Sequence, residues 1–268
     1  PDLQAHLAAQ AEEKSSIVNR QLPIVNSQST NQPTHQSTSR QPLRGLRRTI
    51  ARRMTQAWQI PQVTTFEEVD ATELVRLRSV LKETAVSQNV RFTYMPLLIK
   101  IVIHALKAFP KFNATLDMEA EEVLLHGDVH IGVAAATDAG LLVPVLRHAD
   151  QLTLLETAQE LARLGEAAKA RTLTSAEAGG STFTISNFGS YGGSVGTPIL
   201  NPPEAAILGV GRLEKKAIVL DDDQIAVRTM LPLALTFDHR LIDGADSGAF
   251  MAHLRRQIEQ PQQQLLDM

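Results

Sequence analysis

Apolar residues recur along this chain with two different periods, and each period predicts a kind of element. Steps of three and four residues predict amphipathic helices over 43–58 and 72–85 and a strongly apolar helix over 96–109. Shorter runs that alternate or are apolar throughout, bounded by Gly, Asp or Pro, predict strands. These strands are expected at 62–70, 112–117, 121–126, 129–137, 141–146, 181–186, 204–212, 216–221 and 224–239.

Two capping boxes mark helix starts in the second half of the chain. Thr153 and Glu156 form a T-x-x-E pattern, in which each residue satisfies a backbone N–H of the other, and predict a helix to about Ala168. Thr174 and Glu177 repeat the pattern and predict a shorter helix.

The composition changes near residue 42. Over 43–268 helices alternate with strands that are apolar throughout, as buried strands are, and a last helix is expected at 247–260; this predicts one α/β domain. Residues 14–42, rich in Ser, Thr, Gln, Asn and Pro, predict a flexible linker. Residues 1–13 have the pattern of a short helix. Because the chain begins at Pro1, we expect a fragment whose linker follows another domain, with a disordered tail as the alternative.

Charge and composition exclude several classes of function. The net charge of the 268 residues is −3, so no global basic field attracts nucleic acid or anionic lipid, and no run approaches the ~18 apolar residues of a membrane span. The arginine-rich face of the helix at 44–53 is expected to be solvated or to pair with a neighbouring subunit. The chain has no cysteine, which excludes disulfides, thiolate metal sites and a cysteine nucleophile and fits a reducing compartment such as the cytoplasm.

The densest candidate chemistry lies in the segment FDHRLIDG, residues 237–244. An apolar strand delivers Asp238, His239 and Arg240 into a turn that ends at Asp243. A histidine there, with its tautomer set by a hydrogen bond, is suited to act as a general base near neutral pH. The alternative is a turn in which Asp238 and Arg240 simply pair.

A second candidate is the strand TFTIS and the Gly- and Ser-rich loop that follows it. Such a loop brings backbone N–H groups and a hydroxyl close to a ligand. The hydroxyl of Ser186 fits a nucleophile, an oxyanion donor or an ordinary strand-end residue, and the residues alone do not separate these roles.

The remaining histidines suggest no site. His104 lies in an apolar helix, as a satisfied core or boundary histidine does. His126 and His130 are four residues apart across a turn, but no third ligand is near them in sequence, so no metal site is expected.

The two candidate segments together resemble a known family. FDHRLIDG resembles the DHRxxDG signature of the acyltransferase components of 2-oxoacid dehydrogenase complexes. TFTISNFGSYGG, GTPILNPPEAAILGVGR, ATDAGLLVPVLRHAD and RGLRRTIARRM resemble four further blocks of the same catalytic domain. The resemblance covers about residues 43–268, and residues 1–13 resemble the tail of the small domain that binds peripheral subunits.

The resemblance implies roles for individual residues. His239 would be the general base that deprotonates the thiol of coenzyme A, and Ser186 would donate a hydrogen bond to the tetrahedral oxyanion. Asp243 would orient the site. The block that contains Asn201, Leu208 and Gly209 would line the coenzyme A channel.

The resemblance also implies an architecture. The fold would be like that of chloramphenicol acetyltransferase, with a mixed central sheet, flanking helices and a trimeric catalytic unit whose site lies between subunits. Trimers would assemble into a 24- or 60-chain core. Partners would be lipoyl domains, on which the lipoyl group is carried outside this fragment, the 2-oxoacid decarboxylase and dihydrolipoamide dehydrogenase subunits; no nucleic acid, membrane or metal is expected.

Two other functions and several acyl groups stay open at this stage. Ser186, His239 and Asp243 also match a hydrolase triad, although Ser186 lacks the GxSxG elbow. A non-catalytic scaffold is the second alternative. Acetyl transfer is preferred from the blocks FTYMPLLIK, NATLD and ATDAGLLVPVLRHAD, with branched-chain, acetoin-specific and succinyl versions as alternatives.

Overall fold

A computed structural model of the chain describes residues 38–88, 90–137 and 140–262. The chain divides into two units, Pro1–Pro42 and Leu43–Met268. The predicted helix at 1–13 and most of the predicted linker lie outside the described residues. The second unit contains all of the predicted catalytic residues.

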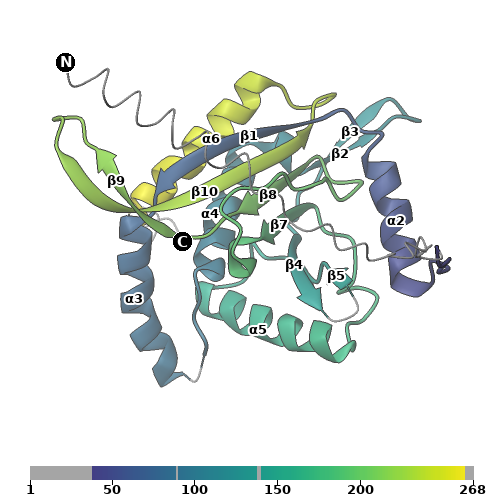
Figure 1. The fold of residues 1–268 in the computed structure, drawn as a ribbon, viewed down its shortest axis with the longest axis horizontal. Coiled ribbons are helices and arrows are strands. Elements are labelled where there is room, and N and C mark those ends of the chain that lie inside the picture. The colour runs from purple at the N-terminus through teal and green to yellow at the C-terminus, as the bar shows by residue number, and fades with distance from the viewer. Residues whose placement is uncertain (1–37, 89, 138–139, 263–268) are drawn as a thin grey trace, which may run out of the picture. The chain divides into compact units, whose positions relative to one another are not determined.

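The second unit is built on a mixed β-sheet with helices packed against it (Figure 1). The main strand order is β1 (Gln62–Asp70), β10 (Ile225–Asp238), β8 (Ala206–Val210), β7 (Phe183–Asn187), β4 (Ile131–Thr137) and β5 (Gly140–Leu142). β9 (Glu214–Val219) pairs with the first half of β10, and β6 (Val145–Leu146) pairs with β4. β2 (Ala114–Asp117) and β3 (Glu122–Leu125) form a separate ribbon. The pairs β4–β7 and β7–β8 are parallel and the other pairs are antiparallel, so the predicted mixed sheet is confirmed.

The helices follow the predicted apolar periods. They are α2 (Gly45–Ala57), α3 (Thr72–Ser87), α4 (Met95–Ala108), α5 (Leu154–Ala170) and α6 (Gly244–Glu259), with short 3₁₀ turns at Pro110–Phe112 and Gly189–Tyr191. α4 is buried along most of its length and contacts both α5 and α6, which explains why its sequence is apolar apart from one stripe formed by Lys100, His104 and Lys107. None of the helices in the described ranges combines the length and the apolar character that a membrane crossing needs.

Strand β10 is the longest strand and delivers the DHR segment. Its first half pairs with β9, and its second half lies buried between β1 and β8. Pro232 cannot donate to a ladder, and it stands between the last residue paired with β9 and the first paired with β8. The carbonyl of Pro232 still accepts a hydrogen bond from Gly211 at 2.8 Å.

Two predicted elements are wrong. The capping-box hydrogen bonds of Thr174 and Glu177 form, but turns follow instead of a helix. The side chain of Arg147 donates to the carbonyls of residues 176, 179 and 180, so a tertiary contact takes these acceptors. The predicted strand 141–146 is two strands, β5 and β6, because Pro144 interrupts the ladder.

Candidate active site

The turn after β10 is built around an ion pair whose carboxylate is buried and whose arginine is exposed. Asp238 is 4% exposed. Its Oδ1 accepts hydrogen bonds from the backbone N–H of Arg240 at 3.0 Å and from the side-chain Nε of Arg240 at 2.9 Å. Its Oδ2 accepts from Nη2 at 2.6 Å. This forked contact satisfies a carboxylate that would otherwise be costly to bury. The predicted structural pair is confirmed.

His239 lies between these two residues in the chain and is exposed. Its backbone N–H donates to the carbonyl of Pro61 at 2.9 Å, which ties the turn to the start of β1. Its ring centroid lies 5.8 Å from that of Phe237. Within the parts of the chain that the structure describes, no side chain hydrogen-bonds to the imidazole, so its nitrogen atoms are open to a ligand.

Asp243 is the N-cap of α6. Its side chain accepts a hydrogen bond from the backbone N–H of Asp246 at 2.9 Å, as N-cap residues commonly do. That hydrogen bond lowers the pKa of Asp243, and the charges of Lys111 and His239 lower it further. The cap was not predicted from the sequence, although an acidic residue three positions later is a helix-start signal.

Ser186 lies on β7 and is half-buried. It pairs with Ala134 of β4 on one side and with Gly209 of β8 on the other. The loop after β7 folds back so that the ring of Phe188 covers Gly209; a Cβ at Gly209 would lie 2.7 Å from that ring. Glycine at 209 therefore allows the aromatic ring to close over the sheet beside Ser186.

Ser186 and His239 are far apart within one chain. Gly209 pairs with both Ser186 and Ala234, so these two residues lie at one level of the sheet. His239 follows Ala234 by five residues, which places it roughly 16 Å along the strands and roughly 10 Å across them from Ser186. The described chain therefore forms no Ser-His-Asp triad: Ser186 stands near the C-terminal end of β7, and His239 follows the C-terminal end of β10, which runs in the opposite direction.

The three residues expected along the coenzyme A channel do not form one cluster. Leu208 is buried in the hydrophobic core, and Gly209 lies beside Ser186. Asn201 lies at the other end of β7, where its Nδ2 reaches the hydroxyl of Ser181 at 3.4 Å.

A buried carboxyl group near Asn201 was not predicted from the sequence. Glu204 is 3% exposed, and its Oε1 accepts hydrogen bonds from Ser181, from Thr184 at 2.9 Å and from Asn201 at 2.7 Å. Its Oε2 has no partner among the described residues. Burial raises the pKa of Glu204 to about 7, and the three hydrogen bonds oppose this rise. The available signal was a lone acidic residue at the start of an apolar strand.

Two pockets are lined by residues close in the chain to the candidate catalytic residues. A pocket of about 240 Å³ is lined by Glu204, Asp238 and Arg240, among others. A more apolar pocket of about 310 Å³ is lined by Phe66, Phe188, Val195, Pro232, Leu233 and Ala234. Ala234 lies at the level of Ser186, two strands away, and the first pocket is lined by both chain neighbours of His239; Ser186 and His239 themselves line neither pocket.

The other histidines are engaged in different contacts. His126 Nε2 lies 3.0 Å from the hydroxyl of Thr115, and His130 Nδ1 accepts a hydrogen bond from the backbone N–H of His148 at 3.0 Å. His104 is half-buried and lies 3.1 Å from the ring of His253.

Comparison with known proteins identifies the family. A family model described as 2-oxoacid dehydrogenases acyltransferase (catalytic domain) matches residues 35–266. The chain is a member of this family. The matched range includes all of the candidate residues named above.

Individual relatives of this acyltransferase-family chain agree with the assignment. It is 43% identical over 221 residues to the lipoamide acyltransferase component of the branched-chain alpha-keto acid dehydrogenase complex of Pseudomonas aeruginosa, covering 82% of this chain and 51% of that protein. It is 40% identical over 230 residues to the acetyltransferase component of the pyruvate dehydrogenase complex of Bacillus subtilis, covering 85% and 52%. The chain thus spans about half the length of the curated relatives it matches.

Solved structures of the family share the fold. The cubic core of a pyruvate dehydrogenase multienzyme complex matches with a TM-score of 0.80 and 38% identity, over 84% of this chain and 93% of that chain. Dihydrolipoamide acetyltransferase of Azotobacter vinelandii matches with a TM-score of 0.79 and 38% identity, over 82% and 91%. That enzyme was studied for the roles of a serine, a histidine and an asparagine in its catalytic mechanism.

Proposed function

We propose that this chain transfers an acyl group between dihydrolipoyl groups and coenzyme A in the core of a 2-oxoacid dehydrogenase complex. The observation that carries this is the placement of Ser186 on β7 and of His239 after the end of β10, two strands apart and at different levels of one sheet, in a chain of the acyltransferase family. The Azotobacter relative supports it, since its catalytic histidine and asparagine are four residues apart, as are His239 and Asp243.

In the proposed reaction, His239 takes the proton of the coenzyme A thiol, and the thiolate attacks the carbonyl carbon of an acyl-dihydrolipoyl thioester. The negative oxygen of the tetrahedral intermediate accepts a hydrogen bond from Ser186. Collapse of the intermediate breaks the bond to the dihydrolipoyl sulfur, which receives the proton back from His239. Asp243 positions the turn through its cap on α6.

The proposed active unit is a homotrimer with the site between subunits. Because Ser186 and His239 do not meet in one chain, the serine of one subunit would face the histidine of its neighbour. Leu208 and Gly209 would contribute their backbone to the part of the channel near Ser186. Asn201 would line the part near His239. The match to a cubic core supports assembly of trimers into a larger core. The proposed location is the cytoplasm, and the proposed partners are lipoyl domains, a decarboxylase and dihydrolipoamide dehydrogenase.

For the acyl group we propose acetyl, as in the Bacillus and Azotobacter relatives. A branched-chain acyl group is the second candidate, favoured by the 43% identity to the Pseudomonas protein.

Acyl transfer to dihydrolipoamide from acetyl-, isobutyryl- and succinyl-coenzyme A tests the proposal. The purified chain is assayed together with its sedimentation profile, and His239→Ala serves as the inactive control. Transfer by a large assembly with acetyl-coenzyme A preferred supports the proposal, and a preference for isobutyryl moves the acyl group to the branched-chain class. An assembled particle that transfers none of the three contradicts it and favours the scaffold function.

A further inference from the structure

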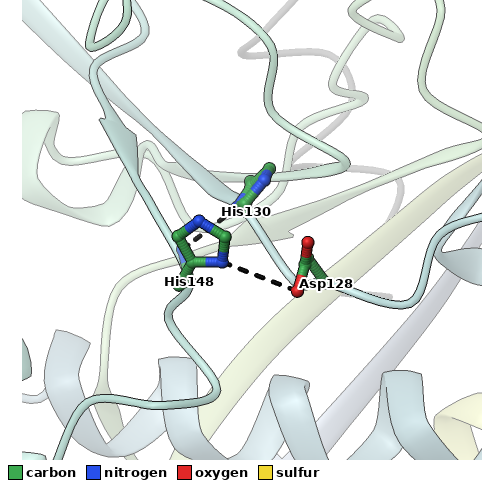
Figure 2. Close-up of side chains that lie close together, drawn as sticks. All are labelled: Asp128, His130 and His148. Atoms are coloured by element: carbon green, nitrogen blue, oxygen red, sulfur yellow. Dashed lines mark hydrogen bonds and ion pairs between the residues drawn. The ribbon is translucent and has the colours of Figure 1, made fainter.

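Three side chains suited to metal binding converge beside the start of β4 (Figure 2). Asp128, His130 and His148 each offer a ligand atom, and these atoms all lie within 4.8 Å of one another. The two imidazole rings are perpendicular, with centroids 4.6 Å apart, and His148 Nδ1 lies 3.5 Å from Asp128 Oδ1. We propose that these three residues bind a divalent transition-metal ion of the Zn²⁺ or Co²⁺ class.

The backbone brings His148 to the other two residues through an irregular pairing. β4 and β6 pair regularly from Ile131 and Leu146, but the next hydrogen bond, at 2.9 Å, joins the N–H of Ala149 to the carbonyl of Val129. The β6 side therefore has one additional residue, as in a β-bulge, which re-aims side chains. His148 has a φ of 45°, a left-handed conformation that is uncommon for residues other than glycine.

Local contacts hold this conformation in place. The backbone N–H of His148 donates to His130 Nδ1 at 3.0 Å, and the backbone N–H of Val129 donates to Asp150 at 3.3 Å. Residues kept in a left-handed conformation by their surroundings cluster at functional sites. The two histidines are thus already next to each other before any ion binds.

An ion would require only a small rearrangement. Ligand atoms around tetrahedral zinc lie about 3.3 Å apart, given bond lengths near 2.0–2.1 Å. The cluster must contract, and the ion would replace the N–H of His148 at His130 Nδ1. His148 and Asp128 are exposed, so their side chains have room to rotate.

The types of ligand atom suit a cation of this class. Two imidazoles with one carboxylate favour Zn²⁺, Co²⁺ or Ni²⁺ over Mg²⁺ and Ca²⁺, which prefer oxygen ligands, and leave coordination positions for water.

The test titrates Co²⁺ alone into the untagged chain and follows visible absorbance and heat. We expect one equivalent bound per chain. His148→Ala and Asp128→Asn should weaken binding by about tenfold or more, because even outer-shell changes have effects of that size. His126→Ala is the matched control, since His126 is four residues from His130 but contacts Thr115, and it should bind like the unsubstituted chain.

Three results would overturn the proposal. The first is no binding at millimolar Co²⁺, and the second is equal affinity in His148→Ala and the unsubstituted chain. The third is loss of binding only in His253→Ala, which would assign the ion to the His104–His253 pair. Asp128→Asn keeps the test decisive if His148→Ala fails to fold, because Asp128 is exposed and its replacement preserves shape. Acyl transfer should be unchanged in Asp128→Asn, which separates this proposal from the proposed function.

Discussion

Ser186 and Ala234 flank Gly209 at one level of the sheet, on β7 and β10. The chain then runs four more residues along β10 to Asp238, and His239 follows in the turn beyond the strand. Since a hydrogen bond spans about 3 Å, the two candidate catalytic residues of one chain cannot act on the same bond. A site that uses both requires two chains.

Mixing two inactive variants tests this requirement. Ser186→Ala and His239→Ala should each be inactive, and a co-assembled equal mixture should recover about a quarter of the normal activity, because random neighbours in a symmetric trimer rebuild that share of the sites. The measurement is acyl transfer after dissociation and reassembly. Confirmed co-assembly with no recovery would refute a site shared between subunits.

The general-base role of His239 predicts a large loss of turnover. His239→Ala should reduce kcat by about 10²–10⁴-fold, which is the usual contribution of a positioned base. Its assembly should be normal, because the ring has no hydrogen-bond partner among the described side chains. Sedimentation checks assembly, and near-normal turnover in an assembled particle would remove His239 from the mechanism.

Ser186 is expected to act without becoming acylated. Ser186→Ala should lower kcat by about 10²–10³-fold with KM little changed, as expected for loss of an oxyanion donor. A serine-directed covalent inhibitor should not label the unsubstituted protein at Ser186. Stoichiometric labelling would instead support the hydrolase alternative.

The cap formed by Asp243 predicts different results for two substitutions. Asp243→Asn keeps an acceptor for the N–H of Asp246 and should retain Tm and most of the activity. Asp243→Ala removes the acceptor and should lower Tm. Thermal unfolding and acyl transfer measured on both variants check this; a large activity loss in Asp243→Asn at unchanged Tm would show that the negative charge itself is needed.

Glu204 predicts a loss of stability as pH rises. Its pKa is about 7 in the folded chain, against an ordinary value of 4.5 for a glutamate, so the stability it contributes is present below about pH 4.5 and is lost through pH 7. The shift corresponds to about 3 kcal/mol. Glu204→Gln stays neutral and should remove this loss between about pH 5 and pH 8, measured by urea unfolding at both values.

Glu177 is the matched control for that measurement. Its pKa is lowered to about 2 by hydrogen bonds from Thr174 and Arg163, so its contribution is lost only as pH falls below about 4.5. Glu177→Gln should lower stability equally at both pH values. If Glu204→Gln keeps the pH slope of the unsubstituted chain, the buried carboxyl is not its source.

The local elements and the residues with chemical potential could be predicted from the sequence alone. They include the apolar helix expected at 96–109, the long strand that ends at Asp238 and the types of residue at 186 and 239. A helix and a strand each turn side chains toward the core at a characteristic spacing. The apolar residues of a single segment therefore show its period without knowledge of the rest of the chain.

Which residues meet one another was settled by the tertiary fold. Strand order separates Ser186 from His239, brings Ser181 and Thr184 to the carboxyl of Glu204, and joins His130 to His148 rather than to His126. The same kind of distant contact turned the predicted helix after Thr174 into a turn. These outcomes depend on pairings between segments far apart in the chain, and such pairings leave no periodic trace in either segment.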